Sequence, residues 1–233
     1  MSIADKLTTI AENTPKVYEA GRKLEHDRFW DDVQDNGTRT FYERAFSYWN
    51  MEYIRPKHKV VPSGSRSMNM FSNNNSLKMV EKKYFDLSNV TVSQGGESSS
   101  NLYAVFYSCP NLEIVEDIGM PAGGYYMTFN RCPKLHTIEV MRVVEQSEFT
   151  SVFTYCSELV NLTIEGTIGK NGFNVSPCPK LSHDSLMSII NCLKDYSADT
   201  SGTSWVVTLG TENLAKLTDA EKNIATEKGW TLV

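Results

Sequence analysis

The sequence predicts an α/β solenoid, in which short parallel strands from successive coils of the chain lie side by side. Three observations lead to this fold class. One short phrase recurs along the middle of the chain, its period is that of stacked supersecondary units, and the last fifth of the chain changes to helix signals. We expect these helices to close one end of the stack, because a bare end would expose apolar side chains and an open strand edge.

The repeated phrase has the form Phe-x-x-Cys-x-x-Leu. Its clearest copies begin at Phe106, Phe129, Phe153 and Val175, and their cysteines are Cys109, Cys132, Cys156 and Cys178, spaced 23, 24 and 22 residues apart. Apolar residues return three and five positions after the leucine, as in Leu135, Ile138 and Val140. An earlier copy at Phe71 carries Asn74 in place of the cysteine, and a fainter copy begins at Phe46. Each copy therefore predicts one strand.

These copies, which cover roughly residues 45–186, resemble the treponemal or BspA-type leucine-rich repeats, whose unit has an Ala-Phe-x-x-Cys-x-x-Leu-x-x-Ile core. The resemblance implies a right-handed leucine-rich-repeat superhelix with parallel strands on its concave face. Such a repeat is a scaffold, so activity has to be argued from a site.

The four repeat cysteines are expected to form one column, because equivalent residues of neighbouring coils lie about 5 Å apart. We interpret them as small buried hydrophobes. Adjacent thiols in such a column are also close enough for a disulfide. Cys192 falls in a helical pattern and is expected in the core.

Four regions follow from the pattern. Residues 1–34 read as a helix with apolar residues at heptad spacing, for docking or self-association or for packing on its own domain; the apolar positions are Ile3, Leu7, Ile10, Val17 and Leu24. Residues 35–66 are rich in aromatics and form either an N-terminal cap or a ligand-stacking surface. Residues 67–181 hold the repeats, with a Gly/Ser insertion at 88–101 that we expect to be exposed.

Residues 182–233 are expected to form two helical rungs that cap the C-terminal end. Ser182 is a good N-cap, and Asp184 lies in the first turn, where the helix dipole favours an anion. The helical spacing continues to Tyr196. A strand is expected at 205–209, a capping box of Thr218 and Glu221 begins the next helix, Gly229 ends it, and a last strand follows at 230–233.

Both ends of the chain are similar to repeat proteins encoded in prophages and phages of gut bacteria. The shared phrases are Lys6-Leu-Thr-Thr-Ile-Ala-Glu-Asn, Lys16-Val-Tyr-Glu-Ala-Gly, Phe29-Trp-Asp, Gln34-Asp-Asn-Gly, Leu181-Ser-His-Asp-Ser-Leu-Met-Ser-Ile-Ile-Asn, Lys216-Leu-Thr-Asp-Ala-Glu-Lys and Lys228-Gly-Trp-Thr-Leu. This similarity implies a virion-associated or host-interaction component.

Composition argues against several classes of partner. With a net charge of −5 and no basic cluster, the chain does not have the positive stripe that binding to nucleic acid requires. It contains no run of about 18 apolar residues, so we expect no membrane insertion. We also expect no secretory signal, because no basic stretch followed by an apolar one opens the chain.

The sequence offers no convincing catalytic constellation. Ser182-His183-Asp184 carries the letters of a hydrolase triad, but consecutive side chains at a helix start point in different directions. No C-x-x-C pair, Cys/His cluster or Gly-rich phosphate loop is present. We therefore expect no enzyme, no metal and no cofactor.

The candidate binding surface is the concave face of the strands. It holds a row of carboxylates at equivalent positions, which is either a solvated row or a surface for a cation or a basic partner. The candidate residues are Glu81, Glu113, Glu116, His136, Glu139, Asn161 and Thr163.

The sequence thus favours a non-catalytic interaction module with a protein or cell-surface glycan partner. The leading hypothesis is a phage or prophage structural or host-recognition component, located in the virion or in the host cytoplasm before assembly. The alternatives are a bacterial adhesin at the cell surface and, as a third hypothesis, a hydrolase whose activity depends on His183.

Overall fold

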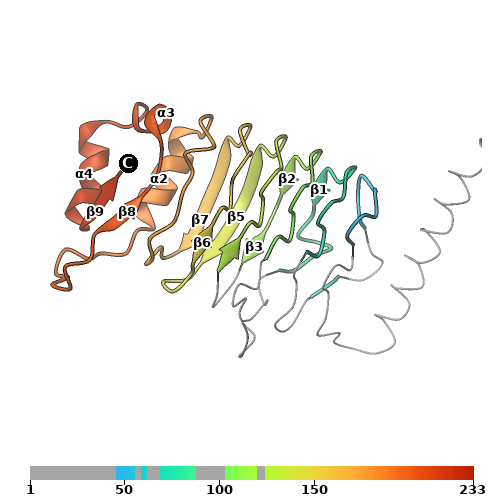
Figure 1. Cartoon of the computed structure of the whole chain (residues 1–233), viewed down its shortest axis with the longest axis horizontal. Helices are drawn as coiled ribbons and strands as arrows, with labels where there is room; N and C mark the ends of the chain where they lie inside the picture. The colour runs from blue at the N-terminus through green and yellow to red at the C-terminus, as the bar shows by residue number, and fades with distance from the viewer. Residues whose placement is uncertain (1–45, 56–58, 62–68, 88–102, 120–123) are drawn as a thin grey trace, which may run out of the picture.

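The computed structural model describes residues 46–55, 59–61, 69–87, 103–119 and 124–233. These residues form an elongated stack of coils that ends in a helical region (Figure 1). The fold is mixed α/β with short parallel strands, which confirms the coarse part of the predicted fold class. The predicted helix at 1–34 and the Gly/Ser insertion at 88–101 lie outside the described residues.

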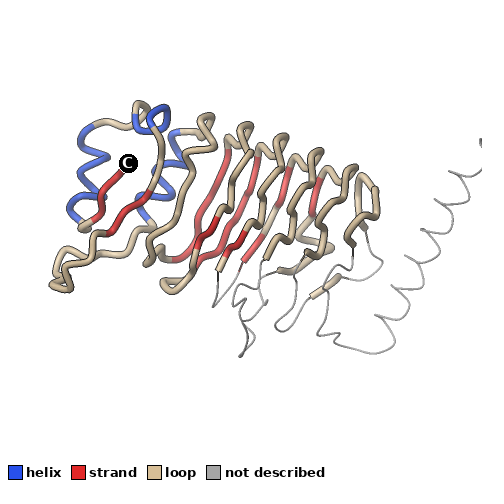
Figure 2. Tube along the Cα trace, viewed as in Figure 1, coloured by secondary structure: helices blue, strands red, loops and turns tan. Residues whose placement is uncertain are grey.

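The main sheet takes its strands from four successive coils, and every pairing in it is parallel. Its order is β1 (Met79–Val80), β2 (Ile114–Val115), β5 (Thr137–Val143) and β7 (Asn161–Gly166), with β3 (Ile118–Gly119) beside the second half of β5. The strands lie side by side along the stack (Figure 2). A second parallel pair joins β4 (Tyr125–Tyr126) to β6 (Phe149–Thr150).

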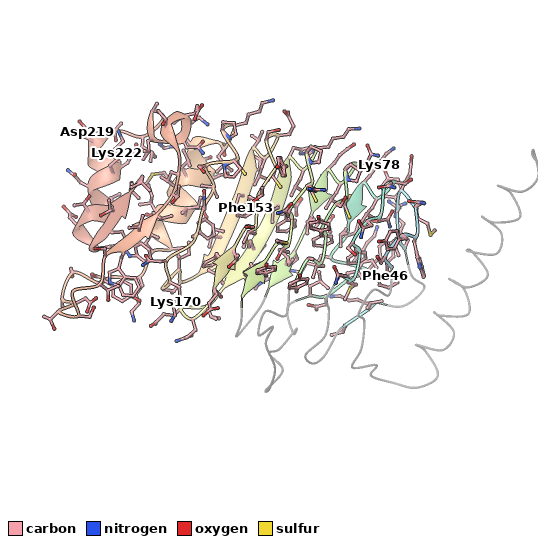
Figure 3. All side chains as sticks on the ribbon, viewed as in Figure 1. Phe46, Lys78, Phe153, Lys170, Asp219 and Lys222 are labelled. Atoms are coloured by element: carbon pink, nitrogen blue, oxygen red, sulfur yellow. The ribbon has the colours of Figure 1, made fainter. Side chains whose placement is uncertain are left out.

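The interior of the stack is a column of phenylalanine rings, one from each coil. The rings are those of Phe46, Phe71, Phe106, Phe129 and Phe153, all buried, with successive centroids 5.2, 5.2, 5.3 and 5.9 Å apart. Figure 3 labels the first and last of them, Phe46 and Phe153. Phe173 ends the column with an edge-on contact to Phe153. The column confirms that the faint copy at Phe46 belongs to the repeat.

The four repeat cysteines are all buried, as predicted, and all five cysteines are free thiols. Three of them donate a hydrogen bond to the phenylalanine carbonyl of the preceding coil. Cys109 Sγ donates to Phe71, Cys132 Sγ to Phe106 and Cys156 Sγ to Phe129, each at 3.0 Å. The thiols therefore link coils as well as filling space.

One inward position was predicted wrongly. Val140 stands five positions after Leu135, where the repeat predicts an inward apolar residue, but it is only half-buried, and Met141 is buried instead. The register between β5 and β7 shifts between Ile138 and Met141. Such a bulge sets two residues of one strand against one of its neighbour and moves the inward position along by one.

The C-terminal region begins as predicted. Helix α2 (His183–Asn191) has Ser182 as its N-cap, and α4 (Asp219–Glu227) opens with the capping box of Thr218 and Glu221. Gly229, with φ at 82°, follows the last turn of α4. Strands β8 (Trp205–Val207) and β9 (Trp230–Leu232) pair in parallel.

Helix α2 ends earlier than the spacing predicted. It stops at Asn191 rather than at Tyr196, because Leu193 forms a parallel bridge with Ile168 and so continues the strand side of the coil. The predicted strand at 205–209 is likewise shorter, ending at Val207. A short helix that the sequence did not predict, α3 (Thr211–Leu214), follows it.

Helix α2 also closes the open edge of β7. The backbone N–H of Leu162 donates to Ser185 Oγ at 2.9 Å, and that of Ile164 donates to Ser188 Oγ at 2.8 Å. A strand edge left open would template further pairing. The serines, spaced three residues apart on one face of the helix, thus replace the next strand.

Candidate functional site

The predicted binding residues lie in the strands of the main sheet or directly beside them. Parallel register puts Met79, Ile114, Thr137 and Asn161 in one row and the buried Val80, Val115, Ile138 and Leu162 in the next. The residues that follow this buried row are Glu81, Glu116, Glu139 and Thr163. The structure therefore places Glu81 and Glu116 directly after β1 and β2, and Glu139 within β5.

The first of these carboxylates is neutralised within the chain. Glu81 is only 8% exposed, and its carboxylate pairs with Arg55 Nε at 2.6 Å and with Lys83 Nζ at 3.0 Å. Burial alone would raise the pKa of Glu81, but the hydrogen bonds and charges of Arg55 and Lys83 outweigh it and hold that pKa below its ordinary value. Glu81 is therefore not an open site for a cation.

The remaining members of the row become progressively more accessible. Glu116 is half-buried, and its Oε2 accepts the backbone N–H of Lys82 at 2.7 Å. Glu139 and Thr163 are exposed. Among the residues that the structure describes, none makes a hydrogen bond or ion pair with the Glu139 carboxylate. The free part of the row is therefore its C-terminal end.

Two more of the predicted residues meet at Thr137. His136 Nδ1 lies 2.9 Å from Thr137 Oγ1, and Asn161 Nδ2 donates to the same oxygen at 3.2 Å. Glu113 precedes this group by one coil and is half-buried. The structure thus gathers His136, Thr137 and Asn161 into one polar patch, beside Glu139 and Thr163 on the same two strands.

An ion-pair network that the sequence analysis missed runs beside this patch. Asp117, only 4% exposed, pairs with Lys82 Nζ at 2.5 Å and with Arg142, whose Nε lies 3.1 Å from Glu165. Its four members come from four successive coils. A signal was present, because Asp117 occupies the position where the repeated phrase expects an apolar residue. Its partners could not be named without the register of the coils.

The letters of the hydrolase triad serve other purposes in the structure. Ser182 Oγ accepts the N–H of Ser185 at 3.3 Å as the cap of α2. His183 Nε2 lies 2.8 Å from Glu221 Oε1 on α4, and its Nδ1 lies 3.8 Å from the exposed Asp184. These contacts agree with the predicted capping role and tie α2 to α4.

The described ranges contain no group of three or more His, Cys, Asp or Glu side chains placed to hold a metal ion. None of the helices in the described part of the chain has the length and apolar character needed to cross a bilayer.

Comparisons of this chain with protein-family models, with curated proteins and with solved structures found no match.

Proposed function

We propose that the stack is a right-handed leucine-rich-repeat solenoid of the BspA type and that it works as a non-catalytic recognition module. The coils that begin at Phe71, Phe106, Phe129 and Phe153 each supply a parallel strand, a ring to the phenylalanine column and a residue to the column that holds the cysteines. The resemblance of the Phe-x-x-Cys-x-x-Leu phrase to treponemal repeats supports the same assignment. In this reading the rungs built on α2 and α4 cap the C-terminal end.

The observation that carries the recognition role is a contrast between equivalent positions. The inner columns repeat the same residue type in coil after coil. The residue just before the cysteine-column position instead changes, from Asn73 to Ser108, Arg131 and Tyr155. The row before the buried strand row also changes, from Met79 through Ile114 and Thr137 to Asn161, although the row after it keeps glutamate until Thr163. A constant interior with a varied surface is how repeat proteins build extended binding faces.

The accessible part of the strand face is our proposed contact surface. It comprises Glu139, Asn161 and Thr163, with His136 and Glu113 at its border. Its hydroxyl, amide and carboxylate groups suit hydrogen bonding to a protein or to a cell-surface glycan. Glu81 contributes to the fold of this face rather than to its ligand, because Arg55 and Lys83 already occupy its carboxylate.

The biological setting that we propose is a phage or prophage component that takes part in particle structure or host recognition. It rests on the similarity of both chain ends to proteins from prophages and phages of gut bacteria. The protein would then be found in virions, or in the host cytoplasm before assembly. Residues 1–34, which lie outside the described residues, would hold copies together or attach them to the particle.

Two measurements test this proposal. Mass spectrometry of purified phage particles should detect the chain, and the purified full-length protein should bind host cells. Glu139→Lys and Asn161→Ala should weaken cell binding, whereas Lys222→Gln, on α4 at the far end of the stack (Figure 3), should not. Absence from particles together with no binding to cells would contradict the proposal.

The same material separates the alternatives. An adhesin would be recovered from the bacterial surface rather than from particles. A hydrolase would turn over a substrate panel and lose that activity in His183→Ala, and we expect no turnover by either protein.

A further inference from the structure

A second accessible cluster lies away from the strands, in the segment that carries the phenylalanines. It consists of Tyr107, Arg131 and Tyr155, which come from three successive coils and which we call the Tyr-Arg cluster. The Arg131 Cζ lies 5.9 Å from the ring centroid of Tyr107 and 6.0 Å from that of Tyr155. The guanidinium thus lies at cation–π distance from two aromatic rings, one in the coil before its own and one in the coil after it.

The backbone at this place does not favour such side chains. Arg131 and Tyr155 directly precede the repeat cysteines Cys132 and Cys156, and both have φ at 64°, in the left-handed region. The equivalent residues Tyr48, Asn73 and Ser108 have φ at 62°, 56° and 56°, so the conformation recurs in each coil, and asparagine tolerates it best after glycine. Tyr155 is nevertheless 64% exposed, so its ring gains little from burial. Bulky side chains held in a costly conformation and turned to solvent point to a role outside the fold.

The charge of Arg131 is also unsatisfied. Of the three arginines in the described ranges, Arg55 pairs with Glu81, and Arg142 pairs with Asp117 and Glu165. Arg131 has neither a carboxylate partner nor a hydrogen-bond acceptor for its guanidinium among the described residues. Its five N–H donors are therefore available to an anion, and a guanidinium matches a carboxylate in two parallel hydrogen bonds.

The backbone beside the cluster excludes one way of binding a peptide. The Arg131 N–H donates to Thr154 O at 2.9 Å, and the Ser108 N–H donates to Asn130 O at 2.9 Å. Since these groups already join neighbouring coils, an extended peptide cannot add here as a further strand. The cluster must instead bind its ligand through its side chains. A ring with an apolar C–H face and an attached carboxylate satisfies both the tyrosines and the arginine.

We infer that the Tyr-Arg cluster binds acidic sugars, with Arg131 holding the carboxylate and the tyrosine rings packing against the sugar. This inference rests on the proposed recognition function and names a ligand class for it. It adds a second contact surface, on the segment that carries the phenylalanines, to the strand-face surface of Glu139, Asn161 and Thr163.

The test uses the full-length protein and isothermal titration with oligomers of galacturonic acid. Wild type should bind them, and the same oligomers with their carboxyl groups reduced to alcohols should bind at least about tenfold more weakly. Arg131→Gln should lower the affinity by about tenfold or more, and Tyr155→Ser should lower it severalfold. Lys134→Gln is the matched control, because it removes a cation three residues away that contacts Asn111 instead of the cluster. Its affinity should stay within about twofold of wild type.

Four outcomes would overturn the inference. They are no binding of the acidic oligomer by wild type, equal binding of the reduced oligomer, unchanged affinity in Arg131→Gln, and equally tight binding of oligoglutamate, which would indicate a site for acidic peptides. Thermal unfolding of each variant confirms that it is folded. If wild type binds none of the acidic oligomer while Glu139→Lys still weakens binding to host cells, the ligand assignment fails and the proposed recognition function stands.

Discussion

Two regions of the molecule hold their chain segments together in different ways. The first is the described part of the stacked coils, from Phe46 to Leu181, and the second is the helical region from Ser182 to Val233. In the coils, the same contacts recur: a ring on a ring, a thiol on a carbonyl and a strand on a strand. In the helical region, single polar side chains make contacts that occur once. Lys228 Nζ donates to the carbonyls of Ile190 and Asn191 at the end of α2, at 3.1 and 2.8 Å.

The difference follows from what each region has to satisfy. A coil between two similar coils finds matching donors and acceptors on both sides, so repetition alone pairs its backbone. The last coil has a neighbouring coil on one side only, so its backbone polar groups need hydrogen-bond partners from side chains of the helical region. Ser185 and Ser188 serve the edge of β7, and Trp230 Nε1 donates to Lys194 O at 2.7 Å. Substitutions in the two regions should therefore fail by different mechanisms.

The largest expected effect is in the shared column. Phe129→Ala removes a fully buried ring between Phe106 and Phe153, and should lower the free energy of unfolding by about 3 to 5 kcal/mol. Chemical denaturation measures it. Phe129→Leu, which refills part of the space, should cost clearly less. If Phe129→Ala unfolds at the wild-type midpoint, the column does not carry the coils.

The column was also the part of the fold most open to prediction. Identical residues at a fixed period predict that equivalent residues stack. The burial of the phenylalanines and cysteines could therefore be predicted from the sequence alone. The bulge that makes Met141 the inward residue in place of Val140 could not be predicted, because an extra residue in a strand leaves the apolar pattern ambiguous. Neither could the end of α2, since Leu193 fits a helix as well as the bridge that it makes.

The positions of the candidate site residues could be predicted, but the ion pairs that neutralise some of them could not. The row containing Glu81, Glu116 and Glu139 followed from the repeat, whereas Arg55 lies 26 residues before Glu81 and meets it only through coil register. The Tyr-Arg cluster left a fainter signal. Aligning the copies shows Arg131 and Tyr155 where the earlier coils carry Tyr48, Asn73 and Ser108, but only the backbone angles reveal that this position is left-handed in each of them.

The second prediction concerns the thiols of the column. Burial raises the pKa of Cys109 and of Cys156 to about 12, from 9.0. The native protein should therefore carry roughly a thousandfold less thiolate at these positions than the unfolded chain, and should react slowly with iodoacetamide at pH 8 until denaturant is added. Fast alkylation of both residues in the native state would contradict their burial.

The same pKa shifts predict an alkaline limit of stability. The folded state holds the thiol protons that the unfolded chain releases above about pH 9, so stability is present below that pH and declines as pH rises toward 12. The double variant Cys109→Ala and Cys156→Ala should show a flatter decline between pH 9 and 11. Denaturation at several pH values measures the slopes, and equal slopes would rule out this origin.

The fourth prediction probes the contacts that occur once. Asn213 is buried, and its Nδ2 donates to Cys178 O at 3.1 Å and to Leu209 O at 2.9 Å. Asn213→Leu leaves both carbonyls without this donor and should cost about 1 to 3 kcal/mol in the free energy of unfolding. Asn223→Leu, at an exposed position on α4, is the control and should change little. Amide exchange should locate the loss in the helical region, and a loss spread evenly over the coils would contradict the division.

The smallest expected effect on stability is that of replacing Tyr155. This substitution separates residues that stabilise the coils from residues that only form their binding surface. Tyr155→Gly relieves a left-handed residue with φ at 64°, but it also loosens the unfolded chain, and the two effects oppose each other. We expect the free energy of unfolding to stay within about 1 kcal/mol of wild type while binding of galacturonic acid oligomers weakens. Tyr155→Asn, which suits the same conformation with a small polar side chain, should behave alike. A loss of stability well above 1 kcal/mol in both variants would mean that the ring supports the stack, and Tyr155 would then belong to the fold rather than to a binding surface.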